Sequence, residues 1–256
     1  MRRATRPSKI SEYFPFMVHS GLTLVLGMML FFGLFGGLAE RIVAIAFMLA
    51  LMSLKVAFHE FGHALIAYHA GDRAVRDKGY LTLNMLRYSD PFTSLLLPGL
   101  IFLWSGIFLP GGAVYLNPAH IDQKKKLWVD LGGIIFDILT LIVLVVIAYL
   151  TIPYGSPAYM GAISAAVLLS IGFIVFNLLP IPPLDGYSAL AELAPGPIRT
   201  KMYEIRGQVG FFLLLILFMF APGMFSFIWD IARFIYKLLD LNLLAAYWGI
   251  EQVRIR

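Results

Sequence analysis

Residues 42–70 of the chain read IVAIAFMLALMSLKVAFHEFGHALIAYHA, and both the fold class and a candidate site can be predicted outward from them. It is long and apolar enough to cross a lipid bilayer as one helix, because about 20 apolar residues suffice. It also carries two histidines and a glutamate, as His59-Glu60-Phe61-Gly62-His63. Ionisable groups within a span are costly unless they are paired or bound to a metal, so the stretch predicts both a membrane span and a functional site.

The composition of the whole chain agrees with a membrane protein. Apolar residues make up 60% of the 256 residues and charged residues 14%, whereas soluble domains carry roughly a quarter charged residues. The first apolar run, residues 17–39, is too long for the core of a cleaved signal peptide, so we expect it to be retained. The chain has no cysteine, so disulfides and thiolate ligands are excluded and a metal must be held by nitrogen and oxygen.

Basic clusters beside the apolar runs set the expected topology. The first span is preceded by Arg2, Arg3, Arg6 and Lys9. This cluster predicts a cytoplasmic N-terminus, and a second span over about 42–70 then returns to basic residues at 72–78. Spans over 127–151 and 159–179 leave the cytoplasm and return to it in turn.

The apolar run 92–110 is expected not to cross the bilayer. It contains Pro98-Gly99 and ends at Pro110, and such helix breakers suit a re-entrant or interfacial segment shielded by protein. After it the chain carries a further span over 207–229 and, from residue 230 to 256, apolar residues at the helical spacing of an interfacial helix.

The predicted fold class is therefore an all-α polytopic membrane protein. We expect about five to six transmembrane helices, with a small β-hairpin or re-entrant segment after the helix that carries the histidine pair. A single membrane-embedded domain covers residues 1–256, with its core at 42–190 and the C-terminal span and interfacial helix at 207–256. The net charge of +5 comes from short clusters beside the spans, which indicates contact with the lipid bilayer and no nucleic-acid partner.

The histidine pair has the spacing of a metal site. His59 and His63 are four residues apart, so they share one helical face and can bind one ion. With only five histidines in the chain, this pattern arises by chance with odds on the order of one in a hundred or less. Glu60 between them is the expected catalytic base. The other histidines are not expected to be ligands, and His19 has no partner motif.

A catalytic zinc needs a third protein ligand and an open position, and Asp185 is the best candidate for that ligand. It closes the segment NLLPIPPLD at 177–185, after a span that returns to the side on which His59 lies. His59 precedes Asp72 by 13 residues, or about 20 Å of helix. The prolines favour irregular backbone around a cavity. The alternative interpretation of Asp185 is a helix cap or turn residue.

HEFGH followed by a distal NLLPIPPLDG resembles the site-2 protease family of intramembrane zinc metalloproteases. The resemblance covers roughly residues 42–190 and is to the compact branch without PDZ and CBS domains. It continues through Gly71-Asp72, GYLTLN at 79–84, Asp90-Pro91 and VYLNP at 114–118. It implies one zinc ion per chain, with His59, His63 and Asp185 as ligands and Glu60 as the base. The implied substrate is a transmembrane protein or peptide.

The chain departs from the family pattern between the two motifs. Where the family carries Gly-Pro and then Asn, this chain has Gly132-Gly133-Ile-Ile-Phe-Asp137. Because that Asn is thought to hold the substrate backbone, we predict substrate contacts for Asp137, and also for Asn177, although a carboxylate lacks the amide donor. Lys55, one helical turn before His59, either pairs with Asp137 or snorkels. Residues 80–88 form either a strand edge that holds the substrate or a plain hairpin.

The expected function is an intramembrane zinc endopeptidase that hydrolyses transmembrane substrates with metal-activated water. We expect it in the cell membrane, plasma or inner, with the N-terminus in the cytoplasm. Two alternatives remain. Asp137 and Lys55 are compatible with a proteolytically inactive structural or assembly subunit that has membrane protein partners. A transporter that uses the polar cluster as an ion site would predict inverted repeats, and the sequence shows none.

Overall fold

A computed structural model of the protein describes residues 9–84, 120–206 and 226–254, together with positions 209–210, 212–213, 216 and 223. The helices in these residues are α1 (Lys9–Phe31), α2 (Gly37–Ala70), α3 (Ala74–Asp77), α5 (Lys126–Asp130), α6 (Gly132–Thr151), α7 (Pro157–Asn177), α8 (Asp185–Leu193), α9 (Gly196–Arg206), α11 (Ser226–Leu238) and α12 (Leu243–Val253). Short 3-10 turns are η1 (Tyr80–Thr82), η5 (Gln123–Lys125) and η6 (Ile152–Tyr154). No strand occurs in the described residues, so the predicted all-α class is confirmed for them.

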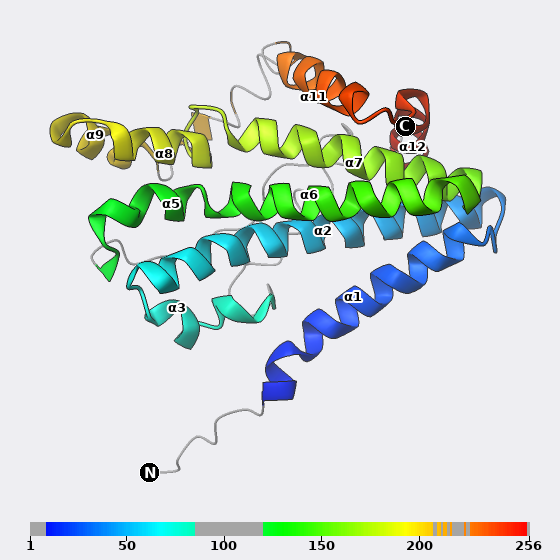
Figure 1. Ribbon diagram of the computed structural model, residues 1–256, viewed down its shortest axis with the longest axis horizontal. Helices are drawn as coiled ribbons and strands as arrows, with labels where there is room; N and C mark the ends of the chain where they lie inside the picture. The colour runs from blue at the N-terminus through cyan, green and yellow to red at the C-terminus, as the bar shows by residue number, and fades with distance from the viewer. Residues whose placement is uncertain are drawn as a thin grey trace.

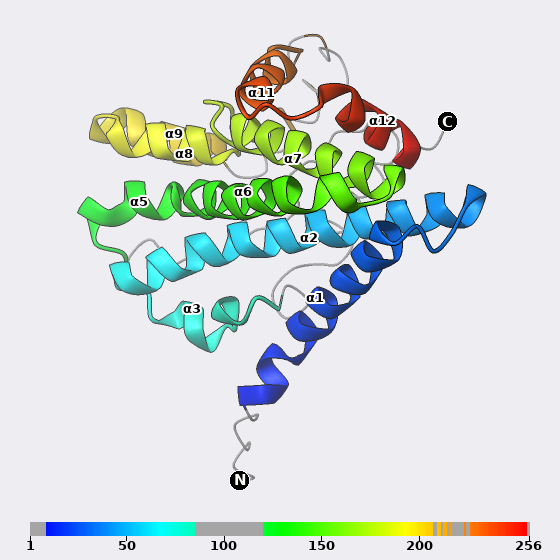
Figure 2. The same cartoon turned by 45° about the vertical axis from the view of Figure 1, so that its right-hand side comes forward.

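Helices α2, α6 and α7 lie side by side and form the centre of the bundle (Figure 1). Helix α1 crosses α2 at an incline, while α11 and α12 cover the far side of α7 (Figure 2). Nearly all of α7 is buried, because other helices surround it. Alanines at the α2–α7 core allow close helix packing; they include Ala44, Ala57, Ala162, Ala165 and Ala166.

The outer faces of the bundle are apolar, as expected for a protein in lipid. Large apolar side chains are exposed along α1 and α6, among them Met17, Leu24, Ile142, Val143 and Leu150. Four candidate membrane spans occur in the described residues: Glu12–Phe31, Gly37–Ala70, Gln123–Tyr154 and Pro157–Asn177. The chain is therefore an integral membrane protein, and the predicted total of five to six spans is not confirmed by these four.

The turn between the first two spans differs from the prediction. Helix α1 ends at Phe31 and α2 begins at Gly37, whereas the sequence predicted a first span to residue 39 and a second from about 42. The reason is a glycine turn, in which Gly33 and Gly37 adopt φ of 60° and 62°. Left-handed backbone ends a helix. Residues 32–35 of this turn are apolar apart from Gly33, so hydrophobicity alone does not locate it.

Helices α1 and α2 are also joined by a polar contact that the sequence analysis missed. The Nε2 atom of His19 lies 2.9 Å from Ser53 Oγ and 3.1 Å from the Ala50 carbonyl oxygen. A polar pair inside an apolar helix interface fixes the relative register of the two helices. His19 therefore has a structural partner on α2, although no sequence motif indicates one.

The chain after the segment 85–119 resumes at the end of the bundle where α2 ends. The Asp122 N–H donates to the Ala70 carbonyl at 3.0 Å, so the chain after this segment resumes beside the end of α2. The predicted re-entrant run 92–110 lies outside the described residues. The described beginning of the predicted strand edge 80–88 is the 3-10 turn η1, which is closed by Thr82 Oγ1 donating to the Gly79 carbonyl. The remainder of that edge, residues 85–88, also lies outside the described residues.

The C-terminal part of the chain folds back onto α7. Most of the predicted span 207–229 lies outside the described residues, and its last four residues belong to α11. The predicted interfacial helix is interrupted after Leu238, and α12 packs on α7. A β-carbon on Gly249 would lie only 2.0 Å from the Gly161 carbonyl oxygen. The absence of side chains at these two glycines is what permits the contact.

A second glycine pair sets the distance between α2 and α6. A β-carbon on Gly62 would lie 2.3 Å from the Gly132 carbonyl oxygen, and one on Gly132 would lie 2.8 Å from the Gly62 carbonyl oxygen. Gly62 is the fourth residue of HEFGH. The backbone contact therefore holds the start of α6 directly against the helical turn that carries the histidine pair.

We expect Gly62→Ala to lower the free energy of unfolding by about 1–3 kcal/mol, because the added methyl group forces α2 and α6 apart. The measurement is thermal unfolding in detergent. Gly21→Ala is the matched control, because no atom lies within 4 Å of a β-carbon at Gly21 on α1. Equal melting temperatures for the two variants would contradict the close approach.

Candidate metal centre

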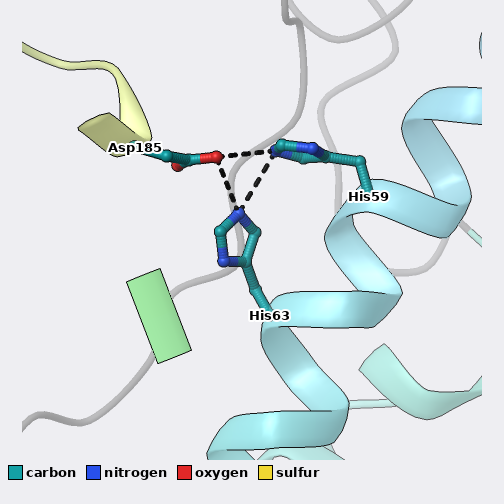
Figure 3. Close-up of side chains that lie close together, drawn as sticks. All are labelled: His59, His63 and Asp185. Carbon is teal, nitrogen blue, oxygen red and sulfur yellow. Dashed lines mark hydrogen bonds and ion pairs between the residues drawn. The ribbon is translucent and has the colours of Figure 1, made fainter. Parts of the chain in front are cut away.

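The two histidines of HEFGH point from α2 toward a common point (Figure 3). The Nε2 atoms of His59 and His63 are 3.2 Å apart, and the planes of the two rings are nearly perpendicular, at 82°. His59 is buried and His63 is partly buried. The predicted sharing of one helical face is therefore confirmed.

The other nitrogen of each ring contacts an acceptor from the chain's next helical segment. His59 Nδ1 lies 2.8 Å from Asp137 Oδ2 on α6, and His63 Nδ1 lies 2.8 Å from the Val129 carbonyl oxygen on α5. Neither acceptor can donate, and the Val129 carbonyl is closer to His63 Nδ1 than the Gly133 N–H at 3.4 Å, so we assign a proton to each Nδ1. In the neutral form of each ring Nε2 is then unprotonated, which is the form that binds a metal.

Asp185 supplies a third oxygen at the same point. Its Oδ2 lies 3.2 Å from His59 Nε2 and 3.3 Å from His63 Nε2. Helix α7 ends at Asn177, the proline-rich segment turns the chain, and Asp185 is the first residue of α8.

The three side chains fit a metal ion better than they fit one another. Asp185 Oδ2 is buried and accepts no hydrogen bond, although it faces two nitrogens. Three converging lone pairs repel each other unless a cation lies between them. Their ligand atoms lie within 4.8 Å of one another, and two imidazoles with one carboxylate are a known catalytic zinc set that leaves the fourth position open.

Gly133 leaves the space that such an ion requires. A β-carbon on Gly133 would lie 2.4 Å from His63 Nε2 and 2.6 Å from His59 Nε2. These distances are close to the Zn–N bond length of about 2.0–2.1 Å, so a methyl group would compete with the ion itself. Only glycine keeps the face of the two Nε2 atoms open at this position.

Glu60 directly follows His59 on α2 and is buried, with 4% of its surface exposed. Its position between the two histidines in the sequence keeps it on the helical turn that carries both. The assignment of Glu60 as the catalytic base stays a prediction.

The predicted pairing of Lys55 with Asp137 is confirmed. Lys55 Nζ donates to Asp137 Oδ1, and Lys55 is only 6% exposed, so the snorkelling alternative is wrong. Asp137 is fully buried. Its two oxygens are engaged by Lys55 and by His59, and its predicted role in substrate binding stays a prediction.

Asn177 is buried at the end of α7, where its Nδ2 donates to the Phe173 carbonyl at 3.1 Å. Its predicted substrate contact also stays a prediction. The Val129 carbonyl and the Phe173 ring, which lies edge-on to His59 at 5.5 Å between centroids, escaped the sequence analysis. A backbone carbonyl and a phenylalanine in an apolar span carry no sequence signal of such a role.

Comparison with known proteins gives three informative relatives. The chain is 35% identical over 197 residues to the zinc metalloprotease Rip2 of Mycolicibacterium smegmatis, covering 76% of this chain and 73% of that protein. It is 33% identical over 206 residues to Rip2 of Mycobacterium tuberculosis strain H37Rv, covering 77% and 78% of the two chains. It is 29% identical over 181 residues to the zinc metalloprotease YwhC of Bacillus subtilis, covering 67% and 80%.

Each of the three names gives the zinc metalloprotease assignment as provisional. No protein-family model and no solved structure matches the chain. Zinc, the metal named for these relatives, is also the ion that the donor set of two imidazoles and a carboxylate suits.

We expect Gly133→Ala to abolish zinc binding without unfolding the protein, because the methyl group would occupy the space beside both Nε2 atoms. Zinc content by mass spectrometry and helicity by circular dichroism test this expectation. Gly21→Ala, which adds the same methyl group in open space, should keep one zinc per chain. A folded Gly133→Ala variant with full zinc content would rule out this position for the ion.

Proposed function

Because the chain belongs to the site-2 protease family of zinc metalloproteases, we propose that it is an endopeptidase that cleaves membrane-spanning proteins within the bilayer. The observation that carries this proposal is the convergence of His59 Nε2, His63 Nε2 and Asp185 Oδ2 on one point. Two of these atoms come from a helix that is itself a candidate membrane span.

The proposed roles divide among four side chains. His59, His63 and Asp185 hold the zinc ion, and Glu60 acts as the general base. When bound, zinc supplies Lewis acidity that activates water and polarises the scissile carbonyl. Glu60 takes the proton from the attacking water and returns it to the departing amine, which is general acid–base catalysis by one carboxyl group. Asp137 and the Val129 carbonyl accept from the Nδ1 atoms and so fix the tautomer and the orientation of the two imidazoles.

The depth of the site supports action inside the membrane. Helix α2 has 34 residues, or about 51 Å, so it exceeds the hydrocarbon core of about 30 Å by about 10 Å at each end if it is centred. His59 precedes the end of α2 at Ala70 by 70 − 59 = 11 residues, or about 16 Å. The histidine pair would then lie some 6 Å beneath the edge of the hydrocarbon core.

The same geometry limits the substrate. An intact transmembrane helix keeps its carbonyls in intrahelical hydrogen bonds, so the scissile bond must leave the helix before it can be attacked. We therefore propose that the substrate is a membrane-spanning segment with helix-breaking residues near the cut. We further propose that the site opens toward the cytoplasm, because the basic residues Arg73, Arg76 and Lys78 follow directly after α2.

We expect the purified protein to cleave a panel of transmembrane peptides and Glu60→Gln to lower that rate by about 10²–10⁴-fold while it keeps its zinc. Asp185→Asn should instead lower zinc affinity, because it removes a charged ligand. Product formation by mass spectrometry and zinc content are measured on the same samples.

Three outcomes of this experiment separate the candidate functions. Zinc in wild type and Glu60→Gln with cleavage by wild type alone supports the protease. Zinc in both with cleavage by neither favours an inactive subunit. Absence of zinc from the wild type would refute the site assignment.

A further inference from the structure

We propose that Lys55 and Asp137 form a charge-balanced positioning pair that holds His59 as a metal ligand and sets the zinc affinity of the site. This inference rests on the proposed zinc site. It assigns to Asp137 a role toward the metal ligand, where the family pattern has a neutral Asn at this position.

The contacts form a chain across two helices. Lys55 Nζ on α2 donates to Asp137 Oδ1 on α6, and Asp137 Oδ2 lies 2.8 Å from His59 Nδ1, again on α2. Lys55 precedes His59 by one helical turn, so Asp137 reaches both from the facing helix. A carboxylate that accepts the Nδ1–H of a ligating imidazole fixes the ring orientation and makes the ring a stronger ligand.

An aromatic ring on a third helix holds the same two α2 residues. The ring centroid of Phe173 on α7 lies 4.6 Å from Lys55 Nζ and 5.5 Å from the ring centroid of His59. The ring contacts the ammonium as a cation–π partner and packs edge-on against the imidazole. Lys55 is thereby held in place by a partner that carries no charge.

The charges explain why Lys55 and Asp137 occur together. A zinc ion carries two positive charges, which the carboxylates of Asp185 and Glu60 balance. A further carboxylate at Asp137 would leave this buried site with one excess negative charge, and an uncompensated charge in a low dielectric is costly. Lys55 supplies the compensating charge. A buried ion pair seldom adds net stability over apolar packing, so stability of the fold alone does not account for it.

This arrangement predicts different effects on zinc binding for the two single substitutions. Asp137→Asn removes the carboxylate and leaves the Lys55 ammonium close to a dication, so the dissociation constant for zinc should rise by about 10–100-fold. Lys55→Met leaves an uncompensated carboxylate that attracts the ion, so zinc affinity should stay equal to wild type or increase. The same variant should melt at a lower temperature without zinc, because nothing then compensates Asp137.

The test is a double-mutant cycle in detergent. Zinc dissociation constants are measured by chelator competition for wild type, Lys55→Met, Asp137→Asn and the double variant, and the absorption bands of cobalt-loaded samples report the ligand field. We expect Lys55→Met to bind zinc as tightly as wild type or more tightly. The double variant should bind zinc more weakly than Lys55→Met, and Asp137→Asn should bind it most weakly. Thr140→Val is the control. Among the described residues Thr140 Oγ1 bonds the Asp137 backbone carbonyl alone, at 3.0 Å, so the zinc affinity of this variant should be that of wild type.

Equal affinity of folded Asp137→Asn and wild type would overturn the proposal. Equal losses of affinity in the two single variants would overturn it as well, because breaking a pair that serves the fold alone would weaken zinc binding equally from either side.

If Asp137→Asn does not fold, the double variant is compared with Lys55→Met. About tenfold weaker zinc binding by the double variant then supports the proposal, and equal binding refutes it. Failure of the wild type to bind zinc would refute the proposed function together with this inference, whereas zinc binding without cleavage would refute the protease alone.

Discussion

In a bilayer, two imidazoles can turn unprotonated nitrogens toward one point only if the proton of each ring has an acceptor elsewhere. For His59 that acceptor is Asp137, and for His63 it is the carbonyl of Val129. Both acceptors belong to the α5–α6 segment, so this segment must lie against α2 at a fixed height. The close backbone contact of Gly62 with Gly132 provides that position. The packing of α2 on α6 and the chemistry of the site therefore depend on the same short distance between the two helix backbones.

The remaining helices complete this arrangement from the other side. Helix α7 is buried among its neighbours, which fixes where it ends, and the proline-rich segment after Asn177 then brings Asp185 to the two histidines. Helices α11 and α12 cover α7 in turn. The lipid-facing surfaces of α1 and α6 carry large apolar side chains, whereas the polar groups of the site lie inside the bundle and are shielded from lipid.

Some of these features were accessible from the sequence and some were not. The three candidate metal ligands were predicted because HEFGH places two histidines on one helical face and because Asp185 follows a span that returns to the side on which His59 lies. The turn between α1 and α2 was misplaced, since the turn residues are nearly as apolar as the spans beside them. The pairing of Lys55 with Asp137 was predicted as one of two alternatives. Its link to His59 was not, because it depends on the rotation of α6 about its own axis.

The amino-acid sequence is enough to establish that the chain lies in a membrane, that His59 and His63 share a helical face, and that a metal can be held only by nitrogen and oxygen. These properties follow from local spacing and composition, which no tertiary contact can change. The sequence does not indicate which groups accept the Nδ1 protons, which glycine leaves room beside the Nε2 atoms, or where His19 finds its partner. Those depend on how closely and at what rotation helices far apart in the sequence approach each other, and backbone carbonyls and absent side chains have no sequence pattern of their own.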